Sequence, residues 1–282
     1  MFRLLGDSVW AFDIEWVPDP ISGRAIYRLP ADTPDEAVFQ RMWQEGGATE
    51  DDPTPFLKTA MCRVVSIAAV LRTRSRDGSV RFQIASIPNL DEGPVAEREV
   101  IARFLDRVGQ HKPQLVGFNS RHSDLVVLTQ RALVHGLSQP SFARKPEGKF
   151  SADPDYYARY SDWHVDLKDH LSGFGKGSPS LHELATSAGI PGKLDVDGNA
   201  VHALWQAGHV RKIVEYNECD AITTYLLWLR AAQFAGLVSA QACQQEQAAF
   251  EIFLLERARS ENQPHLTMYV EAWRALRELT GR

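Results

Sequence analysis

Strand-like hydrophobic runs and helix-like hydrophobic repeats alternate along this chain. The first run, residues 8–17 (SVWAFDIEWV), is rich in aromatic and β-branched residues and predicts a strand buried on most of its surface. The Asp77-Gly78 pair predicts a hairpin turn between two later runs, which extend the first strand into an antiparallel edge. Those later runs, together with a short buried one further on, are residues 62–74, 79–87 and 114–118.

Apolar residues spaced three to four positions apart predict the helices. Ser180 and Glu183 form the capping-box pattern of a helix start. Strands that precede helices, with acidic residues at the junctions, predict an α/β sheet whose strand ends carry the chemistry. The helical repeats occur at residues 94–108, 124–136, 201–208 and 210–234, and in two further patterns from about residue 239 onwards.

The connection after the first strand is long, polar and rich in proline. It runs from residue 18 to about residue 60 and predicts little regular structure apart from a short helix at PDEAVFQRMWQ. Connections of this length are unusual inside a compact domain and often have a function. Two interpretations are equally open, a flap over a site and an insertion without a role.

Composition is typical of an ordinary globular protein, with 282 residues of which 44% are hydrophobic and 24% charged. The net charge of -5 gives no global basic field, so any nucleic acid has to bind in a local groove. Three widely spaced cysteines predict neither a disulfide framework nor a zinc site. The N-terminus lacks the apolar core of a signal peptide, and no stretch approaches the roughly 18 apolar residues of a membrane span. We therefore expect a cytoplasmic protein that does not enter a membrane.

Two acids interrupt the first strand. Asp13 and Glu15 are two positions apart, so on a strand their carboxylates project from the same face. Neighbouring buried carboxylates repel each other unless one is protonated, paired with a base or neutralised by a cation. For this pair alone, an edge strand with one polar face in water is the favoured explanation. Further carboxylates at the same place decide against it.

Asp124 and Asp220 are the candidates for such carboxylates. Asp124 lies at the start of a helix that follows the strand 114–118, where capping of the helix also explains an acid. Asp220 lies in the middle of the helix 210–234, where capping is no explanation. Tyr216, four residues earlier, shares its helical face. This pair indicates an active site or a bound ligand, with a solvated helix face as the alternative.

Three segments resemble a known family when taken in order. FDIEWVPD, GFNSRHSDLVVL and YNECDAITTYLLWLR are similar to the three motifs of the DEDD superfamily of 3′–5′ exonucleases. The subgroup they resemble is the predicted exonucleases related to the proofreading domain of B-family DNA polymerases. HVDLKDHLSGFG, SLHELATSAGIPGK and LDVDGNAV resemble the linking blocks of that family, and the resemblance covers about residues 9–231.

The resemblance implies an RNase H-like fold, a mixed five-stranded sheet flanked by helices with the Asp13/Glu15 pair on its central strand. Tyr216 corresponds to the tyrosine that orients the attacking water in the tyrosine variant of the superfamily. Position 215 is Glu, so the chain does not show the histidine variant. Oxygen ligands suit two Mg²⁺ or Mn²⁺ ions rather than zinc. The residues implied to bind these two ions are Asp13, Glu15, Asp124 and Asp220.

Substrate contacts are expected near the second motif. Asn119 corresponds to an asparagine near the substrate, and Arg121 and His122 would assist phosphate binding, helped by Lys145 or Lys149. Residues 138–160 mix basic and aromatic side chains, which suits a grip on a single strand, although an ordinary solvated loop is favoured.

The expected activity is a metal-dependent 3′–5′ exonuclease that acts on single-stranded DNA or RNA with a free 3′ end, with DNA favoured, and releases nucleoside 5′-monophosphates. The expected organisation is an exonuclease domain at residues 1–238, with the insertion at 18–60, and a helical extension at 239–282 packed on it. The alternatives are a non-catalytic module that binds nucleic-acid ends, an RNA-processing exoribonuclease, and a structural or protein-interaction domain.

Overall fold

A central mixed sheet organises the fold. The computed structural model describes residues 2–147, 151, 153–172, 177–192, 194 and 200–281. Within these residues five strands form one sheet in the order β3-β2-β1-β4-β5, in which β1 is antiparallel to β2 and parallel to β4. The expected mixed five-stranded RNase H-like sheet is confirmed. Its strands are β1 (Ser8–Pro18), β2 (Cys62–Arg74), β3 (Val80–Ile87), β4 (Gln114–Gly117) and β5 (His164–Asp166).

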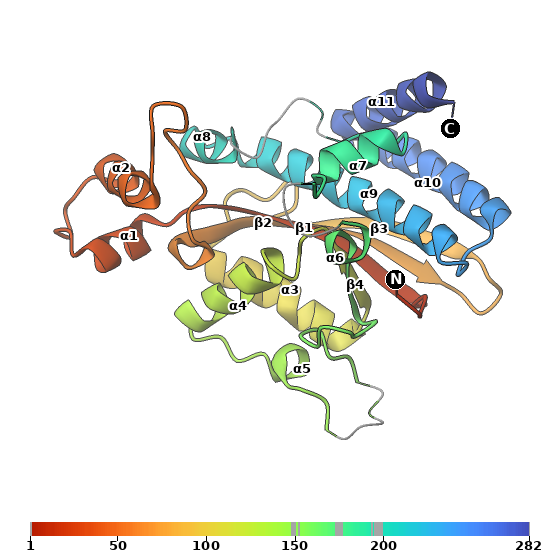
Figure 1. The fold of residues 1–282 in the computed structure, drawn as a ribbon, viewed down its shortest axis with the longest axis horizontal. Helices are drawn as coiled ribbons and strands as arrows, with labels where there is room; N and C mark the ends of the chain where they lie inside the picture. Colours follow the sequence, from red (N-terminus) through yellow and green to blue (C-terminus); the bar gives the residue numbers. More distant parts are fainter. Residues whose placement is uncertain are drawn as a thin grey trace.

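Helices cover both faces of the sheet (Figure 1). On β1, Val9 and Ala11 pack into the core beneath α9 (Val210–Phe234), whereas Trp10 and Phe12 pack against the helices of the other face. Those helices are α3 (Glu97–His111) and α4 (Asp124–Val134). Because side chains alternate along a strand, the odd-numbered residues of β1 face α9. The side chains of Asp13 and Glu15 therefore project from the same face of the sheet, toward α9.

The C-terminal helices share the core of the sheet. Buried residues of α10 (Ala240–Ser260) and α11 (Pro264–Thr280) belong to the same hydrophobic cluster as α9. Arg72 on β2 and Glu246 on α10 form an ion pair with Nε and Oε1 2.6 Å apart, and their side chains are 2% and 8% exposed. The Tyr225 hydroxyl of α9 donates a hydrogen bond to the same Glu246 oxygen over 2.6 Å. Sheet, α9 and α10 are thus joined by buried polar contacts as well as by packing. The remaining short helices are α5 (Pro140–Ala143), α6 (Leu167–Leu171), α7 (Leu181–Ser187) and α8 (Val201–Gln206), and α7 begins with the predicted capping box.

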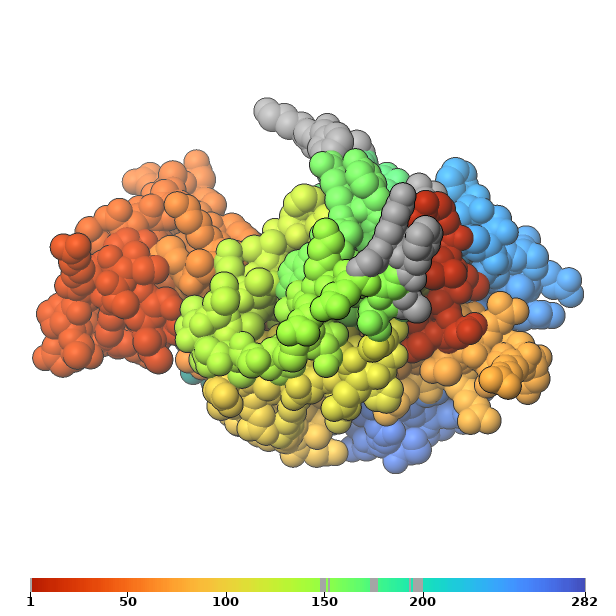
Figure 2. Space-filling model, turned by 90° about the horizontal axis from the view of Figure 1, so that it is seen from below, coloured from red at the N-terminus to blue at the C-terminus, as the bar shows by residue number. Residues whose placement is uncertain are grey.

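The segment after β1 is folded, and the prediction of little regular structure there is wrong. It contains α1 (Pro20–Tyr27), α2 (Asp35–Gly46) and a 3₁₀ turn (Thr59–Met61), with a small core of its own. The predicted helix at PDEAVFQRMWQ is confirmed as α2. The sequence did not predict α1, because its apolar residues do not form one buried face: Ile21 and Ile26 are 71% and 53% exposed. We call residues 19–61 the N-terminal lobe, and Figure 2 shows it, in red to orange, projecting from one end of the molecule.

A buried charge network fixes the N-terminal lobe to the body. Asp19 accepts a hydrogen bond from the Ile21 backbone N–H at the start of α1. The Arg131 guanidinium of α4 lies 2.9 Å from an Asp19 oxygen and 2.6 Å from a Glu97 oxygen of α3. Burial opposes ionisation of Asp19, but a hydrogen bond from Ser22 and the charge of Arg131 lower its pKa overall. The root of the lobe is therefore held in one position relative to α3 and α4.

Of the four aromatic residues at 138–160 that the structure describes, two belong to the core and two, Tyr157 and Tyr160, are exposed. Phe142 and Tyr156 are both buried, and their rings stack with centroids 5.2 Å apart. Lys149 and Phe150 lie outside the described residues, as do parts of the segments 172–180 and 189–201. None of the helices in the described part of the chain has the length and apolar character needed to cross a membrane.

Candidate active site

Three acidic side chains converge between β1 and α9. One carboxylate oxygen each from Asp13, Glu15 and Asp220 lies within 4.8 Å of the other two. The register of β1 against β2 shifts directly after Glu15, which marks a β-bulge at the end of the acidic pair. Since β1 is the middle strand of the sheet, an exposed edge strand does not explain the Asp13/Glu15 pair. The cluster places three carboxyl groups in one small volume.

Asp124 approaches the cluster from the opposite side, at the start of α4. Its side chain is buried, one oxygen lies 2.7 Å from Ser123 Oγ, and it also accepts a hydrogen bond from the backbone of Ile14 in β1. The carboxylate therefore contacts β1 beside Asp13, although it is not within the group of three. All four acids line one cleft with a volume of about 520 Å³.

The surroundings of Asp13 and Asp124 favour the protonated forms of these two acids. Burial raises the pKa of Asp13 well above its ordinary value, and the charges of Asp124, Glu15 and Asp220 raise it further. Burial also raises the pKa of Asp124, to about 7, although the hydrogen bond from Ser123 opposes the shift. A positive charge in the cleft would therefore favour the ionised forms of Asp13 and Asp124.

Tyr216 lies one helical turn before Asp220, as the spacing predicts, and its hydroxyl donates a hydrogen bond to the Asp220 carboxylate. The ring is buried against Val17, Val65 and Ile213. Burial, followed by the charges of the neighbouring acids, raises the pKa of the phenol. The phenol therefore stays protonated at neutral pH and acts as a hydrogen-bond donor toward the cluster.

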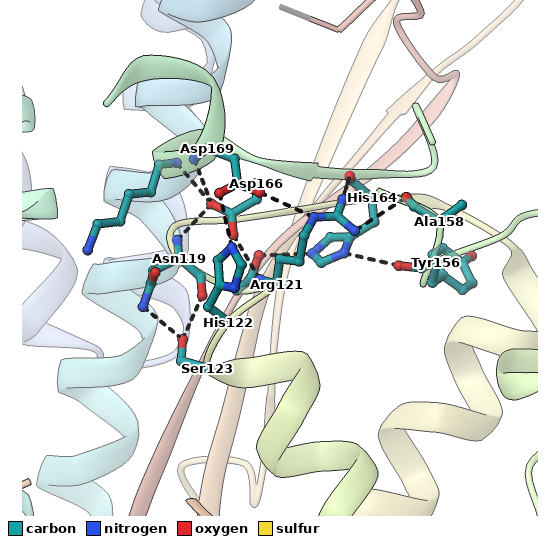
Figure 3. Close-up of polar contacts among 11 residues, drawn as sticks. Asn119, Arg121, His122, Ser123, Tyr156, Ala158, His164, Asp166 and Asp169 are labelled. Carbon is teal, nitrogen blue, oxygen red and sulfur yellow. Dashed lines mark hydrogen bonds and ion pairs between the residues drawn. The ribbon is translucent and has the colours of Figure 1, made fainter. Parts of the chain in front are cut away.

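Asp166, at the end of β5, fixes the turn between β4 and α4 (Figure 3). One of its oxygens accepts from the backbone N–H groups of Asn119 and Lys168, each over 2.9 Å, and the other accepts from the Arg121 N–H over 2.8 Å. Asn119 has a φ of 64°, in the left-handed region, which this turn requires. Asp166 was not among the predicted site residues. Its available signal was an acid at the junction of a short buried strand and a helix, where it caps the start of α6.

The three predicted substrate-binding residues take different positions. Asn119 and His122 line the cleft, and the His122 side chain is 63% exposed with its Nε2 3.2 Å from Asp169. Arg121 is not among the lining residues of the cleft in the described part of the chain. Its guanidinium donates to the backbone carbonyls of Ala158 and His164 over 3.3 and 3.0 Å, and its side chain is 12% exposed. In this structure Arg121 holds the turn together.

Replacing Asp166 by alanine is expected to lower the free energy of unfolding by about 3 kcal/mol. The substitution leaves the partly buried backbone N–H groups of Asn119, Arg121 and Lys168 without an acceptor, and each hydrogen bond to a charged group contributes about 1.5–3 kcal/mol. Urea denaturation measures the change. Asp153→Ala is the matched control, because Asp153 makes an exposed ion pair with Lys112 and should change stability by less than about 1 kcal/mol. Equal stability of the two variants would contradict the role of Asp166.

Comparison with known proteins connects this geometry to a family. Residues 54–273 match the family described as predicted 3′-5′ exonuclease related to the exonuclease domain of PolB. The match includes Asp124, Tyr216 and Asp220 and runs into α11, whereas Asp13 and Glu15 precede it. The comparison with curated proteins gives no match. Because the matched residues make up well over half of the sequence, the chain belongs to the family of predicted 3′–5′ exonucleases related to the exonuclease domain of PolB.

Proposed function

We propose that this protein is a metal-dependent 3′–5′ exonuclease that removes nucleotides from the 3′ end of a single strand, with DNA favoured over RNA, and releases nucleoside 5′-monophosphates. The observation that carries the proposal is the meeting of four acids from three separate segments, β1, α4 and α9, in one cleft, with Tyr216 hydrogen-bonded to one of them. Membership of the exonuclease family supports the reaction class.

The acids fit a pair of divalent cations. Their ligand atoms are all carboxylate oxygens, which Mg²⁺ and Mn²⁺ prefer, and three of them are close enough to share an ion. Bound ions would activate a water molecule and stabilise the departing 3′ oxygen. The residues that would hold them are Asp13, Glu15, Asp124 and Asp220.

The other residues of the cleft position the reactants. Tyr216 keeps its proton and donates a hydrogen bond, so it would orient the attacking water rather than deprotonate it. Asn119 and His122 reach the cleft from the turn that Asp166 holds, and both can donate hydrogen bonds to phosphate oxygens. Arg121 supports them by fixing that turn.

Incubation with labelled oligonucleotides tests the proposal. Single and double strands of DNA and RNA, labelled at the 5′ end, are incubated with Mg²⁺, Mn²⁺ or a chelator. The expected result is a ladder that shortens one nucleotide at a time from the 3′ end of single strands and is absent with chelator or a blocked 3′ end. Binding of the strands without any cleavage in either metal would instead identify a non-catalytic module.

Mn²⁺ is expected to raise the melting temperature by several degrees at pH 8, and the gain should shrink as the pH falls below about 7. The folded-state pKa of Asp124, about 7, lies above its ordinary value of 3.8. The metal-free protein therefore loses stability as the pH rises between these values, because the folded state binds more protons than the unfolded chain. A bound cation offsets this loss of stability, but protons displace the cation at low pH.

Scanning calorimetry with and without Mn²⁺ measures the shift in melting temperature, and Asp220→Asn should reduce this shift. A melting temperature that does not change when Mn²⁺ is added at pH 8 would exclude the metal site.

A further inference from the structure

We propose that Trp16, Trp43 and Phe56, together with His202, form a subsite that stacks against the bases at the 3′ end of a single strand. The proposal rests on the proposed function and adds how that site holds its substrate. The four side chains line the same cleft as the acids, at the side formed by the N-terminal lobe.

The first part of the subsite is a pair of perpendicular rings. Trp16 follows Glu15 directly, across the β-bulge of β1. Its ring centroid lies 6.2 Å from that of Phe56 at an interplanar angle of 88°. Phe56 is 79% exposed although it belongs to the cleft lining. An exposed ring beside a bound phosphodiester offers a face for a nucleobase, because base stacking on aromatic side chains tolerates every base.

The second part is His202 of α8, set against α2. Its ring meets those of Phe39 and Trp43 edge to face, with centroids 4.7 and 5.2 Å apart. Both of its ring nitrogens are buried and have no hydrogen-bond partner among the described residues. Burial lowers the pKa of His202, so the ring is neutral and carries one donor and one acceptor. Because both nitrogens are buried, His202 lines the cleft with its carbon atoms, so it supports Trp43 and adds to the wall against which a base can pack.

The N-terminal lobe, which carries Trp43 and Phe56, is a fixed part of the structure. Asp19 and Arg131 anchor its root. Within it, Gly23 of α1 packs so closely on α2 that a Cβ at this position would lie 2.6 Å from Val38 and 2.7 Å from Met42. Ordered rings contribute more to binding than mobile ones, because less conformational entropy is lost when the ligand arrives.

Nucleobases are the occupants that the position of the rings favours. A strand whose terminal phosphodiester meets the acids has its adjoining bases within the same cleft of about 520 Å³. Bases are free to stack on protein only when the strand is unpaired, so the subsite also selects single strands. Trp16 and Trp43 precede the residues that match the exonuclease family, whereas Phe56 and His202 lie within them.

The binding of two single strands that differ only in their 3′ bases tests the subsite separately from catalysis. Full-length Asp220→Asn protein, in which cleavage is blocked, is titrated in Mn²⁺ with fluorescent oligothymidylate and with the same strand carrying abasic residues at its 3′ end. The intact strand should bind at least about 10-fold more tightly than the abasic strand, in line with the binding free energy that base stacking on aromatic side chains contributes. Quenching of tryptophan fluorescence should accompany binding of the intact strand.

Adding Phe56→Ala or Trp43→Ala should bring the two affinities to within about twofold of each other. Phe56 is largely exposed, so its variant tests the subsite even if loss of Trp43 disturbs the lobe. Phe234→Ala is the matched control, because Phe234 is 82% exposed at the far end of α9, and it should keep the full preference for bases. Equal binding of the two strands to the parent protein, or a preference that survives Phe56→Ala, overturns the subsite. Cleavage by the wild-type protein is scored in the ladder assay, so a failed subsite and a failed nuclease give different results.

Discussion

Asp13→Asn and Asp220→Asn are each expected to reduce metal-dependent cleavage of a single strand by at least about 10³-fold. Asparagine keeps the size of the side chain but removes a charged oxygen ligand from the cluster. A rate loss of this size corresponds to about 4 kcal/mol of transition-state stabilisation, which is within the contribution that positioned metal ions make. Single-turnover cleavage of a 5′-labelled oligonucleotide in Mg²⁺ measures the loss.

Stability provides the second readout for these variants. Burial, and then the neighbouring charges, oppose ionisation of Asp13, so its neutral replacement should leave the metal-free fold at least as stable as the wild type at pH 8. Lost cleavage in an equally stable protein then reports on the site rather than on folding. Asp153→Asn, at an exposed ion pair, is the control for the substitution and should cleave normally. More than a tenth of wild-type activity in either cluster variant would remove that acid from the catalytic site.

Tyr216→Phe is expected to lower kcat by about 10²-fold with little change in KM. The variant keeps the ring packed against Val17 and Ile213 and removes only the hydroxyl that donates to Asp220. A group that positions the attacking water acts on the chemical step, and positioned proton-handling groups contribute about 10²–10⁴-fold. Such a group contributes little to ground-state binding of the substrate, so the loss falls on kcat.

Steady-state kinetics with a single-stranded substrate separates kcat from KM for this variant. Tyr157→Phe is the matched control, since its hydroxyl contacts Thr129 at a partly exposed position and does not line the cleft. The control should retain wild-type kinetics. If Tyr216→Phe has the same kcat as the wild type, the Tyr216 hydroxyl does not orient the attacking water.

Sequence patterns predicted the parts of the fold in which one periodicity dominates. The helix expected at 210–234 has those bounds in the structure, because its long apolar repeat is buried beneath the sheet and α10. The strand at 8–17 is likewise found as β1, where strict alternation of sides brings Asp13 and Glu15 to one face. The meeting of these acids with Asp220 followed from spacing and from the resemblance together.

Other features could not be predicted from local pattern. The helix α1 has exposed apolar residues and rests on a cap at Asp19 and on contacts with α2, which only the folded lobe provides. The side chain of Arg121 was expected to face substrate, but the carbonyls that hold it come from Ala158 and His164, far along the chain. Long-range polar contacts of this kind leave no periodic signal.

The alternation of sides along β1 makes the active site sensitive to chain length as well as to residue identity. Val9 and Ala11 pack on one side of the sheet and Trp10 and Phe12 on the other. Loss of a single residue before Asp13 would turn every following side chain over and direct both carboxylates into the apolar layer beneath α3. Insertions and deletions in this strand should therefore be more harmful than most single substitutions within it.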